Sequence, residues 1–520
     1  MTERQLFKKI YEVSKALNAE VYVVGGYVRD ELLGLDEQKE VKKEISRVQA
    51  AWQKDLIEGG VDLIVEEYKE KKDIDFVVLG GGLEFAKKFD EVLNQSASAP
   101  HHAGATADKA GSLVEFSEFD TARYILSDFE IEFAGARKEK YQEKSRKPSV
   151  APATLAEDLS RRDFTVNALA RKVLSTKLGE IVDPYGGQMD LEKKLLRTPL
   201  DPNETFSEDP LRMLRAARFA SQLGFGIEAR TYEALRVNHG RLRIVSAERV
   251  QEELFKLLAT PQPSIGLAIL FETELLKEFL PEVARLDGVE EVYGEQHKNN
   301  LWHSFKVVDN LATRTNKPLL RFAGLTHDIG KPGTKQFARG RGWTFDMHEH
   351  LGRKLVRQIG RRLRMSVADT EYVAKLVRWH QQPINLMDEG ITDSAVRRLV
   401  FNLGLDIDDL LKLCRSDITT GNPRKRERRL RNYDILEEKI LRVIEKDKLR
   451  EFQSPIRGEE IMKACGLKAG PTIGKIKKAI EEAILDGIIP NEEESARKFF
   501  LEIKNEFVEK AEGWELTDNG

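Results

Sequence analysis

The sequence predicts an α/β N-terminal domain followed by a largely all-α body. Strand-like and helix-like segments alternate over about the first 190 residues, and strand signals almost vanish after that point. Amphipathic helical patterns then follow one another, separated by short turns that contain Pro and Gly. A length of 520 residues is too great for a single hydrophobic core and favours about three to four domains.

The first strand, residues 21–26, ends in two glycines and leads directly into a helix. The bare backbone N–H groups of Gly25 and Gly26, together with the helix N-terminus, can hold phosphate oxygens. Arg29, one turn into the helix, adds a cation that can reach a phosphate. Many strand-to-helix turns contain such a glycine pair, and a surface ion pair is the ordinary role of such an arginine. These residues therefore indicate a phosphate site only in combination with other features.

The segment KKDIDFVVLGG, residues 71–81, places two carboxylates at the start of an apolar strand. Because successive strand side chains alternate between faces, Asp73 and Asp75 share one face and the apolar residues next to them share the other. Two adjacent negative charges repel each other unless a cation lies between them, and Mg²⁺ prefers oxygen ligands. The simpler alternative is that these residues are the solvent-exposed start of a strand, flanked by lysines.

The segment FEIEFAGAR, residues 129–137, predicts a further strand by its strict alternation. Its three apolar side chains face one side, and Glu130 and Glu132 face the other. Glu132 can therefore supply a third carboxylate. Three carboxylates around two Mg²⁺ ions are the arrangement that in-line nucleotidyl transfer requires, because the metals activate the attacking hydroxyl and neutralise the leaving pyrophosphate.

Charge is balanced over the whole chain, with 84 basic and 87 acidic residues and a net charge of −3. A polyanionic partner must therefore be held by local basic patches, for which residues 137–147, 361–364 and 424–431 are candidates. Each of these runs can equally be a solvated helix face. The two cysteines, Cys414 and Cys465, are too few for a disulfide framework. The chain shows no signal peptide and no long apolar run, so we expect a cytoplasmic protein without membrane contact.

Five motifs follow one another along the chain: GGYVRD, DIDFVV, EDLSRRDFTVNALA (157–170), DPYGGQMDLEKKLLRT (183–198) and EDPLRMLRAARFASQLGF (208–225). In this order they resemble the CCA-adding enzymes, which are tRNA nucleotidyltransferases of the class that also includes bacterial poly(A) polymerases. The resemblance runs from about residue 20 to at least residue 260. A charge-rich insertion at 36–72 departs from it, because 46 residues separate Gly26 from Asp73 where the family has a short loop.

The resemblance assigns roles that the chemistry of the residues supports. It implies that Asp73 and Asp75 hold Mg²⁺ and, with Glu132, form the catalytic set. A ribose offers hydroxyls that suit Asp and Asn, whereas arginines suit phosphate; by itself, a run such as RRDF is more often a charged helix face. The expected triphosphate contacts are Gly25, Gly26 and Arg29, and the expected ribose and phosphate contacts are Arg161, Arg162, Asp163 and Asn167.

The segment EDPLR, residues 208–212, predicts how a base is selected. Asp209 and Arg212 are three residues apart and lie on one side of a helix start. Cytosine and adenine both present an amine donor beside a ring-nitrogen acceptor, so a carboxylate and a guanidinium together admit C and A and reject U and G. Discrimination of about 10⁴ is attainable in this way. The alternative is that Pro210 begins the helix and Asp209 merely caps it. The resemblance adds Arg215 to the nucleotide contacts.

A second group of polar residues lies in the helical body, where five of the nine histidines of the chain occur with carboxylates. It resembles an HD phosphohydrolase domain, whose pattern of ligands is met by His303, His327, Asp328 and Asp417. His348 and His380 match positions that hold a second metal in some relatives. Imidazole together with carboxylate suits a divalent metal that activates water. A helical scaffold with an idle site is the alternative.

The resemblance implies a polymerase-β-like mixed sheet and a chain of four domains. We expect a nucleotidyltransferase catalytic domain at 1–175, a helical base- and RNA-binding region at 176–290, an HD-type domain at 291–432 and a helical tail at 433–520. The tail carries several lysines and either grips the tRNA body or serves only for packing.

These features together predict template-independent addition of CCA to the 3′ end of tRNA, with CTP and ATP as substrates, Mg²⁺ as cofactor and the tRNA acceptor arm as partner. A poly(A) polymerase, or an enzyme that adds only part of CCA, shares every catalytic motif. Residues 111–124 are acidic where poly(A) polymerases resemble one another in a basic run, which speaks against the first of these. A phosphohydrolase whose first domain only binds nucleotide or RNA is the remaining alternative, and it requires Asp73 and Asp75 to be idle.

Overall fold

The computed structural model describes residues 1–35, 71–97, 111–140, 149–296, 299–388, 392–447 and 456–515. Contacts divide the chain into two compact units, Met1–Val245 with Glu272–Leu275, and Ser246–Phe271 with Leu276–Gly520. Most of the predicted insertion, 36–70, lies outside the described residues, as do residues 141–147 of the first basic run. Within the described ranges, no helix is both long and apolar enough to cross a membrane.

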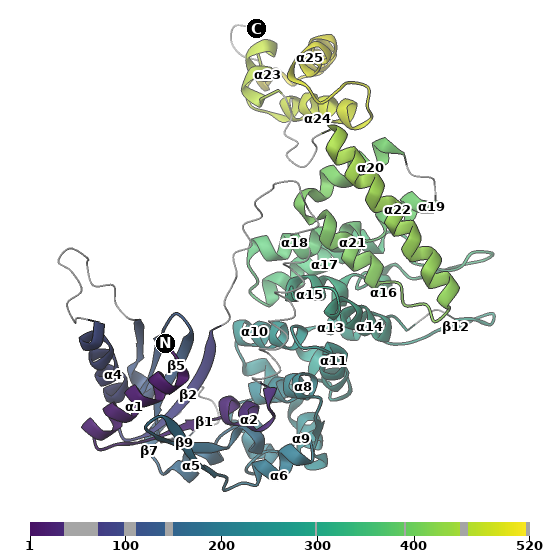
Figure 1. Ribbon diagram of the computed structural model, residues 1–520. Coiled ribbons are helices and arrows are strands. Elements are labelled where there is room, and N and C mark those ends of the chain that lie inside the picture. Colours follow the sequence, from purple (N-terminus) through teal and green to yellow (C-terminus); the bar gives the residue numbers. More distant parts are fainter. Residues whose placement is uncertain are drawn as a thin grey trace, which may run out of the picture. The chain divides into compact units, whose positions relative to one another are not determined.

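The first unit is built on a mixed sheet of seven strands (Figure 1). The strand order is β3-β4-β5-β2-β1-β8-β9, in which β2 and β5 run parallel and the other neighbours are antiparallel. The strands are β1 (Glu20–Val24), β2 (Lys72–Leu79), β3 (Ser112–Phe116), β4 (Thr121–Ile125), β5 (Phe129–Gly135), β8 (Ala170–Leu174) and β9 (Lys177–Val182). Two short pairs accompany it, β6 (Arg137–Lys140) with β7 (Ser149–Pro152) and β10 (Leu195–Leu196) with β11 (Gly226–Ile227).

One face of this sheet packs against helices α1 (Glu3–Ala16) and α4 (Gly82–Ala97) (Figure 1). Buried aromatic rings fill this layer: Phe76 of β2 stacks on Phe133 of β5 with ring centroids 5.3 Å apart, and Phe85 of α4 lies 5.1 Å from Phe133. Ile74, Phe76 and Val78 of β2 and the apolar side chains that alternate along β5 therefore point to the helices, and the acidic side chains of both strands point to the opposite face.

The opposite face carries a smaller apolar cluster that includes Val24, Val77, Leu159 and Ala170. Helix α2 (Gly26–Leu32), helix α5 (Leu155–Ser160) and the 3₁₀ turn Thr165–Asn167 lie around it. The unit continues with α6 (Gly187–Glu192), α7 (Pro202–Glu208), α8 (Leu211–Leu223), α9 (Ala229–Asn238) and the 3₁₀ helix His239–Ile244.

The second unit is almost entirely helical. Its helices are α10 (Ala247–Leu258), α11 (Pro263–Glu272), α12 (Leu275–Phe279), α13 (Pro281–Ala284), α14 (Asn300–Ala312), α15 (Pro318–Thr326), α16 (Lys331–Thr334), α17 (His348–Arg362), α18 (Val367–Trp379), α19 (Gln382–Asp388), α20 (Asp393–Leu403), α21 (Ile407–Ser416), α22 (Pro423–Asp447), α23 (Gly458–Cys465), α24 (Pro471–Leu485) and α25 (Glu493–Val508). Two small hairpins interrupt them, β12 (Glu291–Val292) with β13 (Glu295–Gln296), and β14 (Gln336–Ala338) with β15 (Gly342–Thr344).

The last three helices have an apolar core of their own, which includes Ile461, Ile476, Ile480 and Phe500. The boundary predicted after residue 175 falls in the β8–β9 hairpin, and the boundary predicted after residue 432 falls inside α22. The first position lies in the turn that joins two paired strands and the second lies within a helix. The division into four domains therefore stays a prediction, and it is finer than the two observed units.

Candidate functional site

The acidic side chains of β2 and β5 lie next to each other on the sheet face opposite α1 and α4. The parallel register pairs Asp73 with Glu130 and Asp75 with Glu132. Arg123 of β4 reaches two of these carboxylates, at 3.0 Å from Glu130 and 3.7 Å from Glu132. The structure thus brings the three predicted catalytic carboxylates, Asp73, Asp75 and Glu132, onto one patch of the sheet.

Gly25 lies directly against this patch. A Cβ atom added to Gly25 would lie 3.6 Å from Asp75 Oδ2, 3.0 Å from Arg162 Nη1 and 3.9 Å from the backbone oxygen of Asn167. Gly25 also has a φ of +75°, in which an L side chain is strained. Both the backbone conformation and the close approach therefore require glycine where α2 begins.

Arg161 and Arg162, of which Arg162 lies close to Asp75, are held by one buried carboxylate. Asp158 is fully buried, and its Oδ1 lies 2.9 Å from Arg161 Nη2 while its Oδ2 lies 3.4 Å from Arg162 Nη2. The Nε–H of Arg162 is buried without a hydrogen-bond partner among the described residues, so it remains a donor for a ligand. Burial raises the pKa of the half-buried Asp75, the charge of Arg162 lowers it, and the charge of Glu132 raises it, with a net increase. Such a carboxylate favours a cation beside it.

A chain of hydrogen bonds links helix α2 to helix α8. Arg29 Nη1 donates to Asn167 Oδ1 at 2.7 Å, Asn167 Nδ2 donates to Asp163 Oδ1 at 2.9 Å, and Arg215 Nε donates to Asp163 Oδ2 at 2.7 Å. Burial alone would raise the pKa of Asp163, but the charge of Arg215 and the hydrogen bonds from Asn167 and Arg215 outweigh it and lower this pKa to about 2. Asp163 is therefore an ionised anchor between two elements of the site.

The sequence predicts that Arg29 contacts phosphate, whereas in the structure its side chain is bonded within the protein. Its side chain is only 4% exposed and pairs with Asp30 at 2.7 Å in addition to Asn167. The ion pair with the neighbouring carboxylate is thus present, but it is buried and not at the surface. In this structure the Arg29 guanidinium fixes the Asn167 side chain.

Asp209 lies between α7 and α8, and its Oδ1 accepts a hydrogen bond from the backbone N–H of Leu211 at 3.2 Å. Helix α8 begins at Leu211 and not at Pro210, which stands at its N-cap. The capping contact of Asp209 is therefore present. Because a carboxylate has further lone pairs, capping does not occupy it fully.

Arg212, in the first turn of α8, is buried and bonded to main-chain oxygens. Its Nη2 donates to the oxygen of Arg161 at 2.5 Å, and its Nη1 donates to the oxygen of Thr205 at 3.2 Å. Nη1 also lies 3.4 Å from Glu208 Oε2. The guanidinium therefore joins α8 to the Arg161–Arg162 segment beside Asp75.

The predicted basic runs have different surroundings. In the run 361–364, Arg362 pairs with Glu282 and Leu363 is buried, whereas Arg361 and Arg364 are exposed. In the run 424–431, the basic side chains of α22 are all exposed, as a solvated or polyanion-binding helix face requires.

The second candidate site lies where α14, α15, α17, α18 and α21 meet. Two sets of side chains present ligand atoms that lie within 4.8 Å of one another, His303 with His327 and Asp417, and Asp328 with His348 and His380. Asp328 faces both sets, because its Oδ2 lies 3.2 Å from His327 Nε2 and its Oδ1 lies 3.4 Å from His348 Nε2. The structure therefore brings together the four residues of the predicted metal site and adds the two further histidines.

Three of the imidazole rings are held in place through Nδ1, which contacts a main-chain oxygen. His327 Nδ1 lies 2.8 Å from the oxygen of Gly324, His348 Nδ1 2.8 Å from that of Phe345, and His380 Nδ1 2.7 Å from that of Val377. A main-chain oxygen only accepts, so each Nδ1 carries a proton and donates it. Each Nε2 is then directed into the cluster, which is how metal-bound histidines are commonly held.

The charges of this cluster fit a divalent cation. Burial alone would lower the pKa of His327, but Asp328 and Asp417 raise it to about 10. Lys331 Nζ lies 2.6 Å from Asp328 Oδ2, so an ammonium pairs with this carboxylate. His327 Nε2 is also a buried atom without a hydrogen-bond partner among the described residues. A metal supplies both the positive charge and the missing partner.

The motifs did not single out Lys331 or Asp158. Asp158 precedes Arg161 and Arg162 by three and four residues, which is the spacing of ion pairs on a helix and is a signal for its role. Lys331 has a similar signal, three residues after Asp328.

Two known families match regions that contain parts of the two candidate sites. Residues 56–197 match the poly(A) polymerase head domain, and residues 300–447 match the HD domain. Residues 224–286 match the probable RNA- and SrmB-binding site of polymerase A.

Curated relatives cover most of the chain. An A-adding tRNA nucleotidyltransferase of Deinococcus radiodurans is 35% identical over 360 residues, which are 67% of this chain and 79% of that protein. The chain belongs to the tRNA nucleotidyltransferase family of CCA-adding enzymes and poly(A) polymerases. This nucleotidyltransferase is also 36% identical to a CC-adding tRNA nucleotidyltransferase of Thermus thermophilus over 359 residues, 67% of this chain and 77% of the relative. A multifunctional CCA protein of Vibrio parahaemolyticus is 29% identical over 409 residues, 76% of this chain and 85% of that protein.

Solved structures share the fold of this nucleotidyltransferase. The Bacillus stearothermophilus CCA-adding enzyme in complex with CTP has a TM-score of 0.60 at 22% identity. The match covers 98% of this chain and 100% of that chain. The Thermotoga maritima CCA-adding enzyme complexed with tRNA has a TM-score of 0.53 at 21% identity, covering 96% of this chain and 95% of the other. The predicted family, fold class and enzyme class are confirmed.

Proposed function

We propose that this nucleotidyltransferase adds C, C and A to the 3′ end of tRNA from CTP and ATP without a nucleic-acid template. The hydrogen-bonded chain from Arg29 through Asn167 and Asp163 to Arg215 carries this proposal. These hydrogen bonds connect the part of the site proposed to bind phosphate to helix α8. The residues proposed to select the base lie at the start of this helix. A rigid connection of this kind suits an enzyme whose own side chains replace a template.

On the reacting side, Asp73, Asp75 and Glu132 are the residues proposed to hold Mg²⁺. Their shared face, and the raised pKa of the buried Asp75, fit a hard divalent cation with oxygen ligands. When bound, Mg²⁺ lowers the pKa of the attacking hydroxyl and neutralises charge on the leaving pyrophosphate.

The triphosphate is proposed to lie between the start of α2 and Arg162. Gly25 lets the main chain approach Asp75 without a side chain in between, and the buried Nε–H of Arg162 offers a donor to a phosphate oxygen. Asp158 prevents the Arg162 side chain from swinging away. The ribose hydroxyls are proposed to reach Asp163 and Asn167.

The base is proposed to pair with Asp209 and Arg212. Asp209 accepts from the exocyclic amine of C or A, and Arg212 donates to the ring nitrogen. Uracil and guanine present a carbonyl and an N–H at these positions, and both groups would then be left without partners. The acceptor arm of tRNA is the proposed polynucleotide substrate.

The experiment uses three tRNA transcripts that end before CCA, after the first C and after CC. Each is incubated with one labelled nucleoside triphosphate and Mg²⁺, and the products are separated at single-nucleotide resolution. We expect C on the first two transcripts, A on the third, and rejection of UTP and GTP. A on the third transcript alone would identify an A-adding enzyme, and arrest after CC would identify a CC-adding one. Runs of A on any RNA would identify a poly(A) polymerase.

A second activity is proposed for the HD cluster, which is metal-dependent hydrolysis of a phosphate at an RNA or nucleotide end. The observation that favours it is the complete set of six ligands, four of them imidazoles directed by main-chain or hydroxyl contacts. A divalent metal bound there would lower the pKa of a bound water. Hydrolysis of 2′,3′-cyclic AMP with Mg²⁺, Mn²⁺ or Ni²⁺ tests it, and failure with all three would leave an idle scaffold.

A further inference from the structure

Two β-hairpins of the second unit carry a row of aromatic rings. Tyr293 connects β12 to β13, and its ring centroid lies 5.9 Å from that of Phe337 in β14. Phe337 is paired in register with Trp343 of β15, and their ring centroids lie 5.4 Å apart. Three rings from two hairpins thus lie one beside the next.

Tyr293 is in an unusual position for a tyrosine. It forms the two-residue turn of its hairpin with Gly294, and both have positive φ, +52° and +80°. Such turns favour Asn followed by Gly, because an L residue with a Cβ atom is strained at positive φ. The side chain is nevertheless 92% exposed, so burial does not compensate for the strain. A strained residue that contributes little to packing points to a role in binding.

Basic side chains accompany the rings. Lys335 Nζ lies over the Trp343 ring at 5.6 Å, and Arg339 and Arg341 are exposed at the turn of the second hairpin. The segment 331–346 contains four basic side chains and one acidic one, Asp346, which lies 3.6 Å from Arg341. The first hairpin and the residue before it carry three acidic side chains, Glu290, Glu291 and Glu295, so the basic side chains lie on the second hairpin alone. Aromatic rings interleaved with Lys and Arg are the surface on which single-stranded nucleic acids bind, because bases stack on the rings and phosphates pair with the cations.

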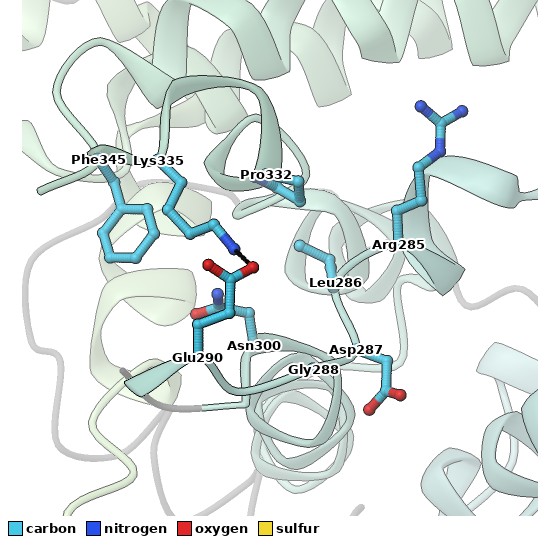
Figure 2. A pocket seen from close by; sticks show the side chains of 9 residues that line it. All are labelled: Arg285, Leu286, Asp287, Gly288, Glu290, Asn300, Pro332, Lys335 and Phe345. Atoms are coloured by element: carbon cyan, nitrogen blue, oxygen red, sulfur yellow. Dashed lines mark hydrogen bonds and ion pairs between the residues drawn. The ribbon is translucent and has the colours of Figure 1, made fainter. Parts of the chain in front are cut away.

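The segment that carries Phe337 and Trp343 also contacts the HD cluster, through Lys331. Lys335 lines a pocket of about 50 Å³ together with Asn300 and Phe345, and it pairs with Glu290 across the pocket (Figure 2). On the same segment, Lys331 Nζ lies 5.5 Å from the Phe345 ring centroid and 2.6 Å from Asp328 Oδ2.

The three rings of the hairpins do not line this pocket, whose one aromatic side chain is Phe345. A base stacked on Tyr293, Phe337 or Trp343 therefore lies outside the pocket.

We propose that Tyr293, Phe337, Trp343, Lys335, Arg339 and Arg341 form a hairpin platform that binds the unpaired 3′ end of an RNA. The terminal phosphate of that RNA is then presented to the HD cluster. This proposal rests on the phosphohydrolase function proposed above and specifies its substrate as an RNA end. A site for free nucleotides has no use for a row of rings outside the pocket, whereas an oligonucleotide has several bases to stack.

The test compares two substrates, 2′,3′-cyclic AMP and a short single-stranded RNA ending in a 2′,3′-cyclic phosphate. Tyr293→Asn removes the ring and places a favoured residue in the turn, so the protein should fold at least as well. Tyr293→Phe is the matched control, because it keeps the ring and the strain. We expect Tyr293→Asn to raise KM for the RNA about 5-fold or more, the effect of losing one stacked base, while KM for cyclic AMP stays unchanged. Tyr293→Phe should resemble wild type on both substrates.

Direct binding separates this proposal from the hydrolytic function. In an Asp328→Asn background, anisotropy of the labelled RNA should show weaker binding with Tyr293→Asn than with Tyr293→Phe. If wild type hydrolyses neither substrate, the phosphohydrolase proposal fails, and the anisotropy still tests the platform. Equal RNA affinity of the two variants, or an equal loss on both substrates with Tyr293→Asn, would overturn the platform.

Discussion

Gly25 lies against the carboxylate of Asp75 and the guanidinium of Arg162, so that a Cβ atom at Gly25 would lie 3.6 Å from Asp75 Oδ2 and 3.0 Å from Arg162 Nη1. We expect Gly25→Ala to reduce nucleotide addition strongly, because the methyl group displaces Arg162 and the φ of +75° strains the start of α2. The strain alone should lower the free energy of unfolding by about 1 kcal/mol or more. Steady-state addition of CMP to a tRNA lacking CCA measures the effect.

Gly34→Ala is the matched control for this substitution. Gly34 has a similar φ of +62°, and a Cβ atom there would meet no described atom within 4 Å. It should therefore lose stability but keep activity. Equal activity losses in the two variants would mean that strain, and not the contact with Arg162, explains the result for Gly25.

Asp75→Asn should abolish nucleotide addition and stabilise the metal-free protein. Burial and the charge of Glu132 both disfavour the ionised carboxylate, so its neutral isostere removes an electrostatic penalty from the fold. Affinity for tRNA should change little, because it comes mainly from Lys and Arg contacts to phosphates. Thermal unfolding in EDTA, an addition assay and tRNA binding measure the three effects. Asp73→Ala should abolish addition in the same way, and near-normal addition by either variant would refute the catalytic assignment.

Asp163→Asn should destabilise the protein in a pH-dependent way. Burial alone would raise the pKa of Asp163, but Arg215 and Asn167 hold it at about 2, below the ordinary value of 3.8. The ionised group therefore stabilises the fold at pH values above about 4, by on the order of 2 kcal/mol, and this contribution is lost as the pH falls towards 2. Denaturant unfolding of wild type and variant should differ most at pH 5 to 7 and converge in acid. The exposed Asp346→Asn serves as the control, with a difference within about 0.5 kcal/mol at every pH. A constant difference for Asp163→Asn would show that its ionisation is not responsible.

Asp328→Asn should remove phosphohydrolysis and spare nucleotide addition. Asp328 faces both sets of ligands in the HD cluster, so its replacement should reduce the binding of metal in both. His348→Ala alters only one set and should reduce the bound metal less than Asp328→Asn does. Metal content after dialysis, measured by mass spectrometry, distinguishes the variants. Normal hydrolysis of a 2′,3′-cyclic phosphate by Asp328→Asn would exclude this cluster as the hydrolytic site.

Local pattern was sufficient to predict the faces of the strands and most of the residues that the structure gathers in the HD cluster. Alternation places Asp73 and Asp75 together within one strand, and the HD pattern identifies His303 and His327 as ligands. Both inferences depend only on the period of an element or on a short motif. The sequence also predicts the change from α/β to helical structure near residue 190, because the two periods differ throughout a long segment.

Relationships between distant segments were not accessible in the same way. That β2 pairs with β5, which sets Asp75 beside Glu132, depends on sheet order and register, and no local pattern encodes it. The burial of Arg29 likewise follows from the position of Asn167, 138 residues away. No sequence motif pointed to Tyr293, because its exposure and its positive φ are properties of the folded hairpin.

Base selection distinguishes a side-chain template from a helix cap at Asp209. The carboxylate accepts a hydrogen bond from the N–H of Leu211 at 3.2 Å, and Asn caps a helix as well as Asp does, so Asp209→Asn should leave stability nearly unchanged. As a base reader, Asn can turn its amide to donate to a carbonyl, and UTP incorporation should then rise relative to CTP. Each base contact is worth about 1 to 3 kcal/mol, which corresponds to about 5- to 150-fold in relative kcat/KM.

Arg212→Ala is a less selective test of the same idea. The guanidinium also donates to the main-chain oxygens of Arg161 and Thr205, so its loss removes two hydrogen bonds and should lower the free energy of unfolding by about 1 to 3 kcal/mol. The oxygen of Thr205 keeps the N–H of Asp209 as a donor, at 3.4 Å. CTP and ATP use should fall, and rejection of UTP and GTP should weaken. Single-nucleotide addition with all four triphosphates, below the unfolding temperature of each variant, gives the comparison. Unchanged base preference in both Asp209→Asn and Arg212→Ala would leave Asp209 as a helix cap alone, and the choice of C and A would have to come from other side chains.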